Sequence, residues 1–220
     1  MEPCGYRSYK ESSSFVRCLE VPTVLAHLGR LKGRSVLDQG CGWGLYTAML
    51  AQKEPKRLVA ADLSPAMLEA AAGFSCNNPV EFRHCDSAAP SGDREFDLIL
   101  ANFLLIFAAD LGRLRHMAKS AYTALKEGGR LLGFVPNCKE GIGLEALAPF
   151  GFSCHPQSGQ LHPGDTVPLR YPAEVLKSVL REAGFASVSL KPPILSAQAE
   201  QSPESWHPIE AAVLFLEAIK

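Results

Sequence analysis

Short apolar runs alternate along this chain with stretches in which apolar residues recur every three or four positions. Runs with the length and composition of β-strands occur at residues 35–38, 57–61, 80–85, 97–101, 130–135, 187–190 and 211–219. Helical spacing occurs between them, at residues 45–52, 65–73, 110–125 and 172–183. Strands that alternate with helices predict a mostly parallel, doubly wound sheet with helices on both faces, in one α/β domain spanning residues 1–220.

Residues with strong helix-end preferences mark the boundaries of these helices. Ser64 can cap the helix at 65–73, with Pro65 at the first position, where a missing N–H costs nothing. We expect Gly128 and Gly129 to close the helix at 110–125, and Gly184 to close the helix at 172–183.

Two regions fall outside this alternation. Residues 1–34 contain an apolar set that Pro22 interrupts, and residues 137–172 contain too many glycines and prolines for a long helix. Long irregular segments in a compact domain are commonly functional, and open α/β sheets bind ligands at the carboxyl ends of their strands. We therefore expect residues 1–34 to form an N-terminal helical cap or lid, and residues 137–172 to form a substrate-lid insertion after the fifth strand.

Composition and charge exclude several classes of partner. Of the 220 residues, 47% are hydrophobic, which is enough to bury a large core. The net charge of −1 leaves no basic field for nucleic acid or anionic lipid. The longest apolar stretch, at 98–109, is too short for a membrane span, and the polar N-terminus lacks the apolar core of a signal peptide. We expect a cytoplasmic protein without nucleic-acid or membrane partners.

The cysteines indicate neither a disulfide framework nor a metal site. There are seven of them, an odd number, and they are scattered along the chain without any C-x-x-C pair. We expect reduced thiols and no bound metal.

A glycine-rich turn follows the first predicted strand, in the segment VLDQGCGWG. Gly40, Gly42 and Gly44 allow positive φ and a close approach of the backbone to a ligand. A nicotinamide-binding loop would place its third glycine where Leu45 stands, and Asp38 would repel a pyrophosphate. The turn therefore favours a cationic group over a polyphosphate, and the chain contains no P-loop motif.

Two more acids follow the next two predicted strands. Asp62 lies 22 residues after Gly40, close to the spacing of about 20 expected for a carboxylate that binds ribose hydroxyls. Asp86 is placed to accept a hydrogen bond from an exocyclic amine. Three strand-end acids with no Lys or Arg beside them suit a nucleoside that carries a cationic amino-acid tail, although solvated or helix-capping acids are the alternative interpretation.

Together these segments resemble the successive motifs of class I S-adenosylmethionine-dependent methyltransferases. The resemblance covers roughly residues 35–135 and rests on the segments VLDQGCGWG, VAADLSPAMLEAA, HCDS, FDLILANF and LKEGGRLLGF. It implies a Rossmann-like sheet of seven strands whose last strand is antiparallel. It also implies S-adenosyl-L-methionine as the cofactor.

The resemblance assigns roles to individual residues. It implies that Asp38 and the glycine turn hold the methionine moiety, that Asp62 holds the ribose, and that Leu63 packs on adenine. Asp86 and Ser87 would contact the adenine edge, and Asn102 and Phe103 would line the methyl side. The full cofactor-binding set that it implies is Asp38, Gly40, Cys41, Gly42, Asp62, Leu63, Met67, Asp86, Ser87, Asn102 and Phe103.

The methyl acceptor is less well defined by the sequence. The segment ANFL is not the N-P-P-Y tetrapeptide typical of enzymes that methylate nucleobase or glutamine amino groups. An oxygen or carbon acceptor usually needs a general base, for which the candidate catalytic residues are His155, His162 and Tyr9, with Tyr6 and Tyr171 as further possibilities.

A diffuse similarity to toxoflavin-forming N-methyltransferases favours a small planar heteroaromatic or phenolic substrate, with nitrogen before oxygen as the accepting atom. The alternatives are a non-catalytic binder of S-adenosylmethionine or nucleotide and a tRNA or protein methyltransferase. We expect a small-molecule partner and either a monomer or a homodimer.

Overall fold

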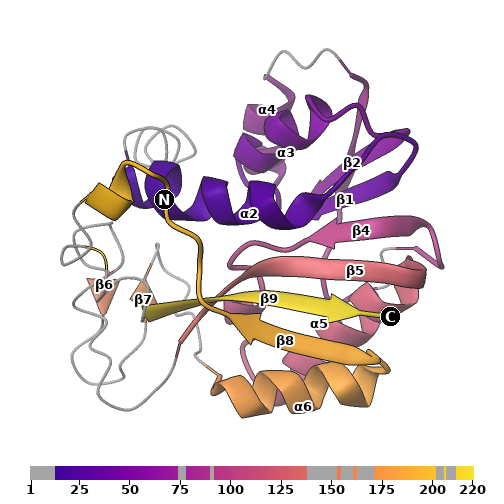
Figure 1. The fold of residues 1–220 in the computed structure, drawn as a ribbon. Coiled ribbons are helices and arrows are strands. Elements are labelled where there is room, and N and C mark those ends of the chain that lie inside the picture. Colours follow the sequence, from indigo (N-terminus) through magenta and orange to yellow (C-terminus); the bar gives the residue numbers. More distant parts are fainter. Residues whose placement is uncertain are drawn as a thin grey trace.

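The computed structural model describes residues 13–73, 78–89, 92–137, 171–201, 206 and 212–220, and the backbone of two short strands at 153–154 and 161–162. Within these residues a seven-stranded sheet has the order β3-β2-β1-β4-β5-β9-β8 (Figure 1). Strand β9 runs antiparallel to both of its neighbours, and the other pairs are parallel. The predicted Rossmann-like sheet with an antiparallel last strand is therefore confirmed.

The strands lie close to their predicted positions. Those of the large sheet are β1 (Ser35–Gln39), β2 (Arg57–Asp62), β3 (Val80–His84), β4 (Phe96–Leu100), β5 (Leu125–Pro136), β8 (Ser187–Lys191) and β9 (Val213–Ile219). A separate pair consists of β6 (Ser153–Cys154) and β7 (Leu161–His162). The helical segments are η1 (Val16–Glu20), α2 (Val21–Leu28), α3 (Leu45–Ala51), α4 (Pro65–Ala72), η2 (Leu105–Phe107), α5 (Leu111–Ala124), α6 (Ala173–Ala183) and η4 (Ala199–Gln201).

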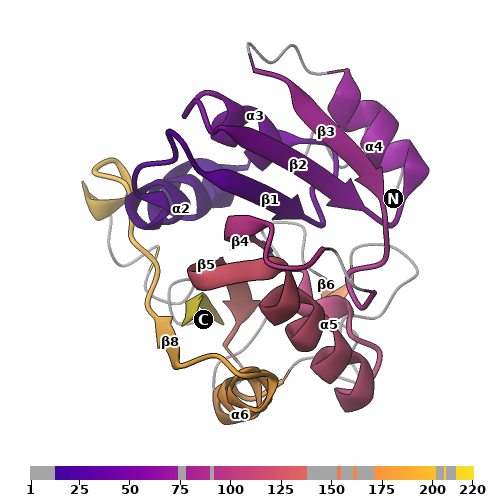
Figure 2. The same cartoon turned by 90° about the vertical axis from the view of Figure 1, so that its right-hand side faces the viewer.

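Helices cover both faces of the sheet, and alternate strand residues face opposite cores. Helices α2, α3 and α4 lie on one face, and α5 and α6 lie on the other (Figures 1 and 2). In β1, Val36 packs with the α2 and α3 side, whereas Leu37 packs with the α5 and α6 side. This alternation explains why the buried strands read as continuous apolar runs in the sequence.

The N-terminal region contains one continuous helix, η1 followed by α2, although Pro22 was expected to interrupt it. The turn η1 is π-helical and leads directly into α2, where Pro22 occupies one of the first two positions. A proline lacks the N–H that an α-helix needs, and the widened turn before it accommodates the missing hydrogen bond. Phe15, Leu19 and Val24 are fully buried against the sheet. The described part of the predicted cap is therefore a helix on the face of the sheet.

The expected closure of α5 by Gly128 and Gly129 is wrong. The helix ends at Ala124, and β5 starts at the next residue because Leu125 is fully buried and pairs with Phe96. The pairing then shifts within β5, where Gly128 adopts φ +70°. The two glycines therefore allow an irregularity inside the strand.

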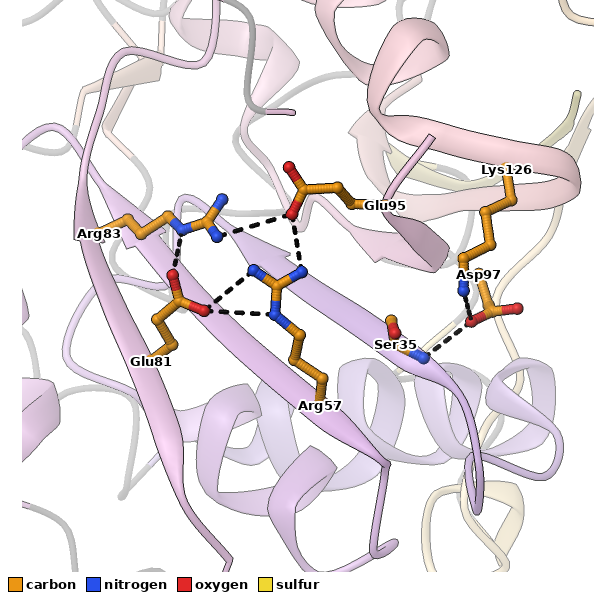
Figure 3. A network of polar contacts seen from close by, with 7 residues as sticks. All are labelled: Ser35, Arg57, Glu81, Arg83, Glu95, Asp97 and Lys126. Atoms are coloured by element: carbon orange, nitrogen blue, oxygen red, sulfur yellow. Dashed lines mark hydrogen bonds and ion pairs between the residues drawn. The ribbon is translucent and has the colours of Figure 1, made fainter. Parts of the chain in front are cut away.

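No helix occurs in the described residues between β3 and β4, and ionic side chains cover that part of the sheet instead (Figure 3). Glu95 accepts from Arg57 at 2.7 Å and lies 3.7 Å from Arg83. Glu81 bridges the same two arginines at 3.0 and 2.6 Å. The Arg57 guanidinium also lies 5.4 Å from the centre of the buried Phe96 ring. This network shields the apolar face where a helix would otherwise pack.

Replacing Glu95 with glutamine tests the contribution of this network. The change removes the charge that both arginines share, and we expect the free energy of unfolding to fall by about 0.5–1 kcal/mol at low salt. The loss should shrink in 1 M salt, where ion pairs are screened. Urea unfolding at the two salt concentrations measures it.

The matched control is Glu127→Gln, because Glu127 contacts Arg94 at 3.9 Å with both side chains largely exposed. We expect no measurable change for this variant. An equal loss in both variants, or a Glu95 effect that salt does not reduce, would contradict a screened ionic network.

Candidate active site

The turn between β1 and α3 is built on left-handed glycines. Gly40, Gly42 and Gly44 have φ of +74°, +53° and +95°. A Cβ on Gly40 would lie 2.7 Å from the Leu104 side chain, and one on Gly44 would lie 3.0 Å from the backbone of Ala71. Both the conformation and the space at these two positions therefore require glycine.

Hydrogen bonds tie this turn to the end of β2. The backbone N–H groups of Gly40 and Cys41 donate to the carbonyl oxygen of Ala61 at 2.7 and 3.0 Å. The Asp62 carboxylate accepts from the Gly42 N–H and from the Ser64 N–H, both at 2.9 Å. Asp62 is thus fixed between the glycine turn and the start of α4.

The surroundings of Asp62 leave it able to bind a ligand. Each of its oxygens accepts one backbone hydrogen bond, and a carboxylate oxygen can accept two. The adjacent residue Leu63 is 60% exposed, so its apolar surface is accessible to a ligand. Ser64 caps α4 as predicted, accepting from the Met67 N–H. A polar acceptor and an apolar platform therefore lie side by side.

Asp38 is a buried acid at the end of β1. Its side chain accepts a hydrogen bond from the Thr47 hydroxyl at 2.6 Å, and the residue is 3% exposed. Burial raises the pKa of Asp38 to about 7, the Thr47 hydrogen bond acts against this, and the nearby Asp62 charge raises it further. A cationic ligand group beside Asp38 would restore its ionised form.

Asp86 has an environment that the sequence did not indicate. Its Oδ1 accepts from the Ala88 N–H at 2.9 Å and from Arg113 of α5 at 2.7 Å. The Ala88 hydrogen bond and the Arg113 guanidinium hold the pKa of Asp86 below its usual value. The expectation that no Lys or Arg lies beside the three acids is therefore wrong, since Arg113 reaches Asp86 from 27 residues away.

The turn after β4 completes the edge. Phe103 has φ +51°, its N–H donates to the Phe134 carbonyl at 3.0 Å, and its ring stacks on Phe134 at 5.6 Å. The Phe103 ring also lies 6.3 Å from Phe15, so the start of the N-terminal helix reaches this turn. Both polar atoms of the Asn102 amide are buried and have no hydrogen-bond partner. Each such group costs about 1–3 kcal/mol when left unpaired.

The structure therefore places most of the sequence-predicted residues at one edge, the carboxyl ends of β1 to β4. Cys41 lies in the turn, but its side chain is buried against Ala60 and Ala71, and burial raises the pKa of its thiol. Tyr171 donates to the Ala108 carbonyl at 3.1 Å. Tyr6, Tyr9 and His155 lie outside the described residues, and only the backbone of His162 is described, in β7.

Sequence reasoning missed several side chains that shape this edge. Thr47 holds Asp38, Arg113 holds Asp86, and the buried Glu20 of η1 accepts from the Tyr46 hydroxyl of α3. None of these pairs has a local sequence signature, because each joins two elements that meet only in the folded chain.

Comparison with known proteins gives matches to methyltransferases over part of the chain. Residues 36–129 match the family model described as a methyltransferase domain. The ribosomal protein L11 methyltransferase of Burkholderia multivorans is 33% identical over 100 residues, which cover 45% of this chain and 31% of that protein. The chain thus spans about a third of the length of the curated relatives that it matches.

Solved structures share the whole fold. The S-adenosylmethionine-dependent methyltransferase from Mesorhizobium loti has a TM-score of 0.67 at 18% identity, covering 96% of this chain and 100% of that one. Magnesium protoporphyrin IX methyltransferase from Synechocystis PCC 6803, with bound S-adenosylhomocysteine, has a TM-score of 0.60 at 20% identity and covers 99% and 84%. Residues 36–129 thus match a methyltransferase domain, and the fold of the described residues is similar to that of these S-adenosylmethionine-dependent methyltransferases.

The Synechocystis neighbour is solved both with bound S-adenosylmethionine and with bound S-adenosylhomocysteine, and the residues at the edge of this chain suit such a ligand. Among the described residues, the edge offers three carboxyl groups, an exposed leucine and a glycine turn, and its one identified cation, Arg113, is paired with Asp86. Acids favour the ammonium and sulfonium charges of the cofactor. A neutral or anionic nucleotide would fit this set less well.

The chain should bind S-adenosylhomocysteine more tightly as the pH rises from 6 to 8. Below pH 7 the Asp38 carboxyl is protonated, and it must ionise to pair with the ligand ammonium group. We expect affinity to rise up to tenfold per pH unit below 7 and to level off above it. Calorimetry at a series of pH values measures this, and Asp38→Asn should flatten the profile.

The stability of the ligand-free chain should depend on pH in the opposite direction. Because the pKa of Asp38 is raised on folding, its contribution to stability is complete below pH 3.8 and is lost as the pH rises through about 7.

A ligand affinity that is constant from pH 6 to 8 in the wild type would contradict the assignment of Asp38 to the ammonium group.

Proposed function

We propose that the protein transfers the methyl group of S-adenosylmethionine to a small, planar heteroaromatic or phenolic metabolite, with nitrogen as the favoured acceptor and oxygen next. The observation that carries the proposal is the row of acids at the ends of β1, β2 and β3 beside the glycine turn. Asp62 would hold the ribose hydroxyls, Leu63 would cover the adenine, and Asp38 would pair with the ammonium group.

The acceptor would lie on the other side of this edge, between residues 1–15 of the N-terminal cap and the 137–172 insertion. Two observations support this placement. Strand β5 runs parallel to β4 and ends at Pro136, so the insertion leaves the sheet at the carboxyl edge. The N-terminal helix starts at the same edge, where Phe15 contacts Phe103. Segments at this position could close over the acceptor and exclude water.

Bound S-adenosylmethionine supplies a methyl group on a positively charged sulfur. The residues of this chain would align the acceptor with that methyl group, and positioning with exclusion of water can supply most of the rate for a neutral nitrogen acceptor. For an oxygen acceptor, we propose that Tyr9, His155 or His162 takes the proton. The domain would act as a monomer or a homodimer in the cytoplasm.

The composition of the chain supports a small neutral substrate. Its net charge is −1, and residues 1–15 and 137–172 carry aromatic and histidine residues but only four lysines or arginines. Within the described residues, no helix is both long and apolar enough to cross a membrane. A protein acceptor is the competing hypothesis, because one relative is a ribosomal protein L11 methyltransferase. The match to that relative covers less than half of this chain.

The deciding experiment is a screen for methyl transfer from labelled S-adenosylmethionine. Heterocycles, phenols and amines are compared with tRNA and purified ribosomal protein L11. We expect turnover of a planar small molecule and none of the macromolecules. Methylation of L11 or tRNA alone would replace the proposed substrate class, and absence of cofactor binding would overturn the whole proposal.

A substitution at Asp62 tests the cofactor site directly. Asp62→Asn replaces one carboxylate oxygen with an amide N–H₂, and removes a charge-assisted hydrogen bond worth about 1.5–3 kcal/mol. We expect the affinity for S-adenosylhomocysteine to fall tenfold or more by calorimetry.

Asp97→Asn is the matched control, because Asp97 also accepts from a backbone N–H, that of Ser35 at 2.8 Å, but lies at the opposite end of the strands. It should lower stability and leave the affinity unchanged. Equal affinities in the wild type and Asp62→Asn would remove Asp62 from the site.

A further inference from the structure

The Asn102 amide is an exception among the buried polar groups of this protein. Within the described residues, only Asn102 and Ser13 bury side-chain polar atoms that lack a hydrogen-bond partner. Asn102 buries two such atoms, its carbonyl oxygen and its amide nitrogen. Native proteins pair almost all buried polar groups, so an amide left unpaired on both sides needs an explanation.

Hydrogen bonds fix the backbone on both sides of Asn102. The Ala101 N–H donates to the Leu132 carbonyl at 2.8 Å, and the Phe103 N–H donates to the Phe134 carbonyl at 3.0 Å. Gly133 lies between these two acceptors, and a Cβ there would collide with the Ala101 carbonyl. The turn is therefore fixed on both sides of Asn102.

Strain in the same turn indicates that its shape is maintained for a purpose. Phe103 adopts φ +51°, a conformation that is uncommon for a residue with a bulky side chain. Stacking of its ring on Phe134 compensates for part of this strain. Backbone strain of this kind concentrates at ligand-binding sites.

The position of the turn places the amide on the acceptor side of the site. Strand β4 pairs with β1 so that Leu100 lies beside Asp38, and Asn102 follows just beyond the strand. The neighbouring Leu104 side chain packs on Gly40 of the glycine turn. On the other side, Phe103 contacts Phe15 at the start of the N-terminal helix. Asn102 therefore stands between the proposed cofactor site and the proposed acceptor cap.

We propose that the Asn102 amide binds the methyl acceptor by a paired hydrogen bond. Its oxygen accepts from an N–H of the acceptor, and its N–H₂ group donates to an adjacent ring nitrogen or carbonyl oxygen. The acceptor class is then a planar heterocycle with a donor beside an acceptor, such as a lactam or an aminopyrimidine-like edge, rather than a simple phenol. Asn102 determines specificity and takes no proton.

This inference rests on the proposed methyltransferase function and changes the role that the resemblance gave to Asn102, from cofactor to acceptor. The amide atoms have no contact with solvent in the ligand-free chain, so the acceptor reaches them only when this edge opens locally. Leucine has nearly the same shape as asparagine and no polar atoms, which makes Asn102→Leu the informative variant.

We expect Asn102→Leu to raise the melting temperature of the ligand-free protein by a few degrees, because an unpaired buried amide is removed. Its affinity for S-adenosylhomocysteine should stay within threefold of the wild type. Its kcat/KM for lactam and aminopyrimidine-type acceptors found in the substrate screen should fall at least 30-fold, mainly through KM. Asn102→Asp, which replaces the donor with an acceptor, should show the same loss of kcat/KM.

The control is the same substitution at an amide that has a partner. Asn78 donates to the Ala51 carbonyl at 2.9 Å, so Asn78→Leu should lower the melting temperature and leave kcat/KM unchanged. A structural role for Asn102 would instead make Asn102→Leu less stable than the wild type, and a cofactor role would weaken binding of S-adenosylhomocysteine. Either result overturns the inference.

The substrate screen separates this inference from the proposed function. Turnover confined to phenols or simple amines, or no turnover of any lactam or aminopyrimidine, contradicts the role of Asn102 while cofactor binding still supports a methyltransferase. Failure of the wild type to bind either S-adenosylmethionine or S-adenosylhomocysteine contradicts the proposed function itself.

Discussion

The hydrogen bonds that the end of β2 accepts from the glycine turn hold the candidate site together. The Ala61 carbonyl accepts hydrogen bonds from the N–H groups of Gly40 and Cys41, and the Asp62 carboxylate accepts one from Gly42. The turn after β1 therefore cannot move independently of β2. Because Asp62 also accepts from Ser64 at the start of α4, one carboxylate joins two strand ends and a helix. The rest of the edge is placed relative to this unit, since β4 and β3 pair with its two strands.

The acids of this edge have different partners, and in Asp38 and Asp86 these surroundings shift the pKa in opposite directions. Burial raises the pKa of Asp38 to about 7, whereas the Ala88 N–H and the Arg113 guanidinium lower the pKa of Asp86. A ligand with a cationic group at one end and hydrogen-bond donors along its length would find a matching partner at each strand. The proposed binding of S-adenosylmethionine therefore depends on the different surroundings of these acids together, rather than on any single residue.

The two faces of the sheet are covered by different means. Beside β2 and β3, the ionic network of Arg57, Glu81, Arg83 and Glu95 covers a region that no described helix reaches. On the other face, a helix with a π-helical first turn extends from the carboxyl edge across the sheet and brings Phe15 to Phe103. The proposed acceptor side of the site is thereby linked to the hydrophobic core through two aromatic rings.

The sequence by itself determined the fold class, the approximate positions of the strands and the residues of the glycine turn. These features depend on local patterns: apolar runs, helix caps such as Ser64, and glycines that allow positive φ at Gly40 and Gly44. It misplaced the end of α5, because the burial of Leu125 against β4 outweighs the local preference of Gly128 and Gly129. Only the tertiary structure decided the partners of each acid and the isolation of the Asn102 amide. Those depend on which side chains distant in the chain meet across the packed elements, and no local pattern encodes that geometry.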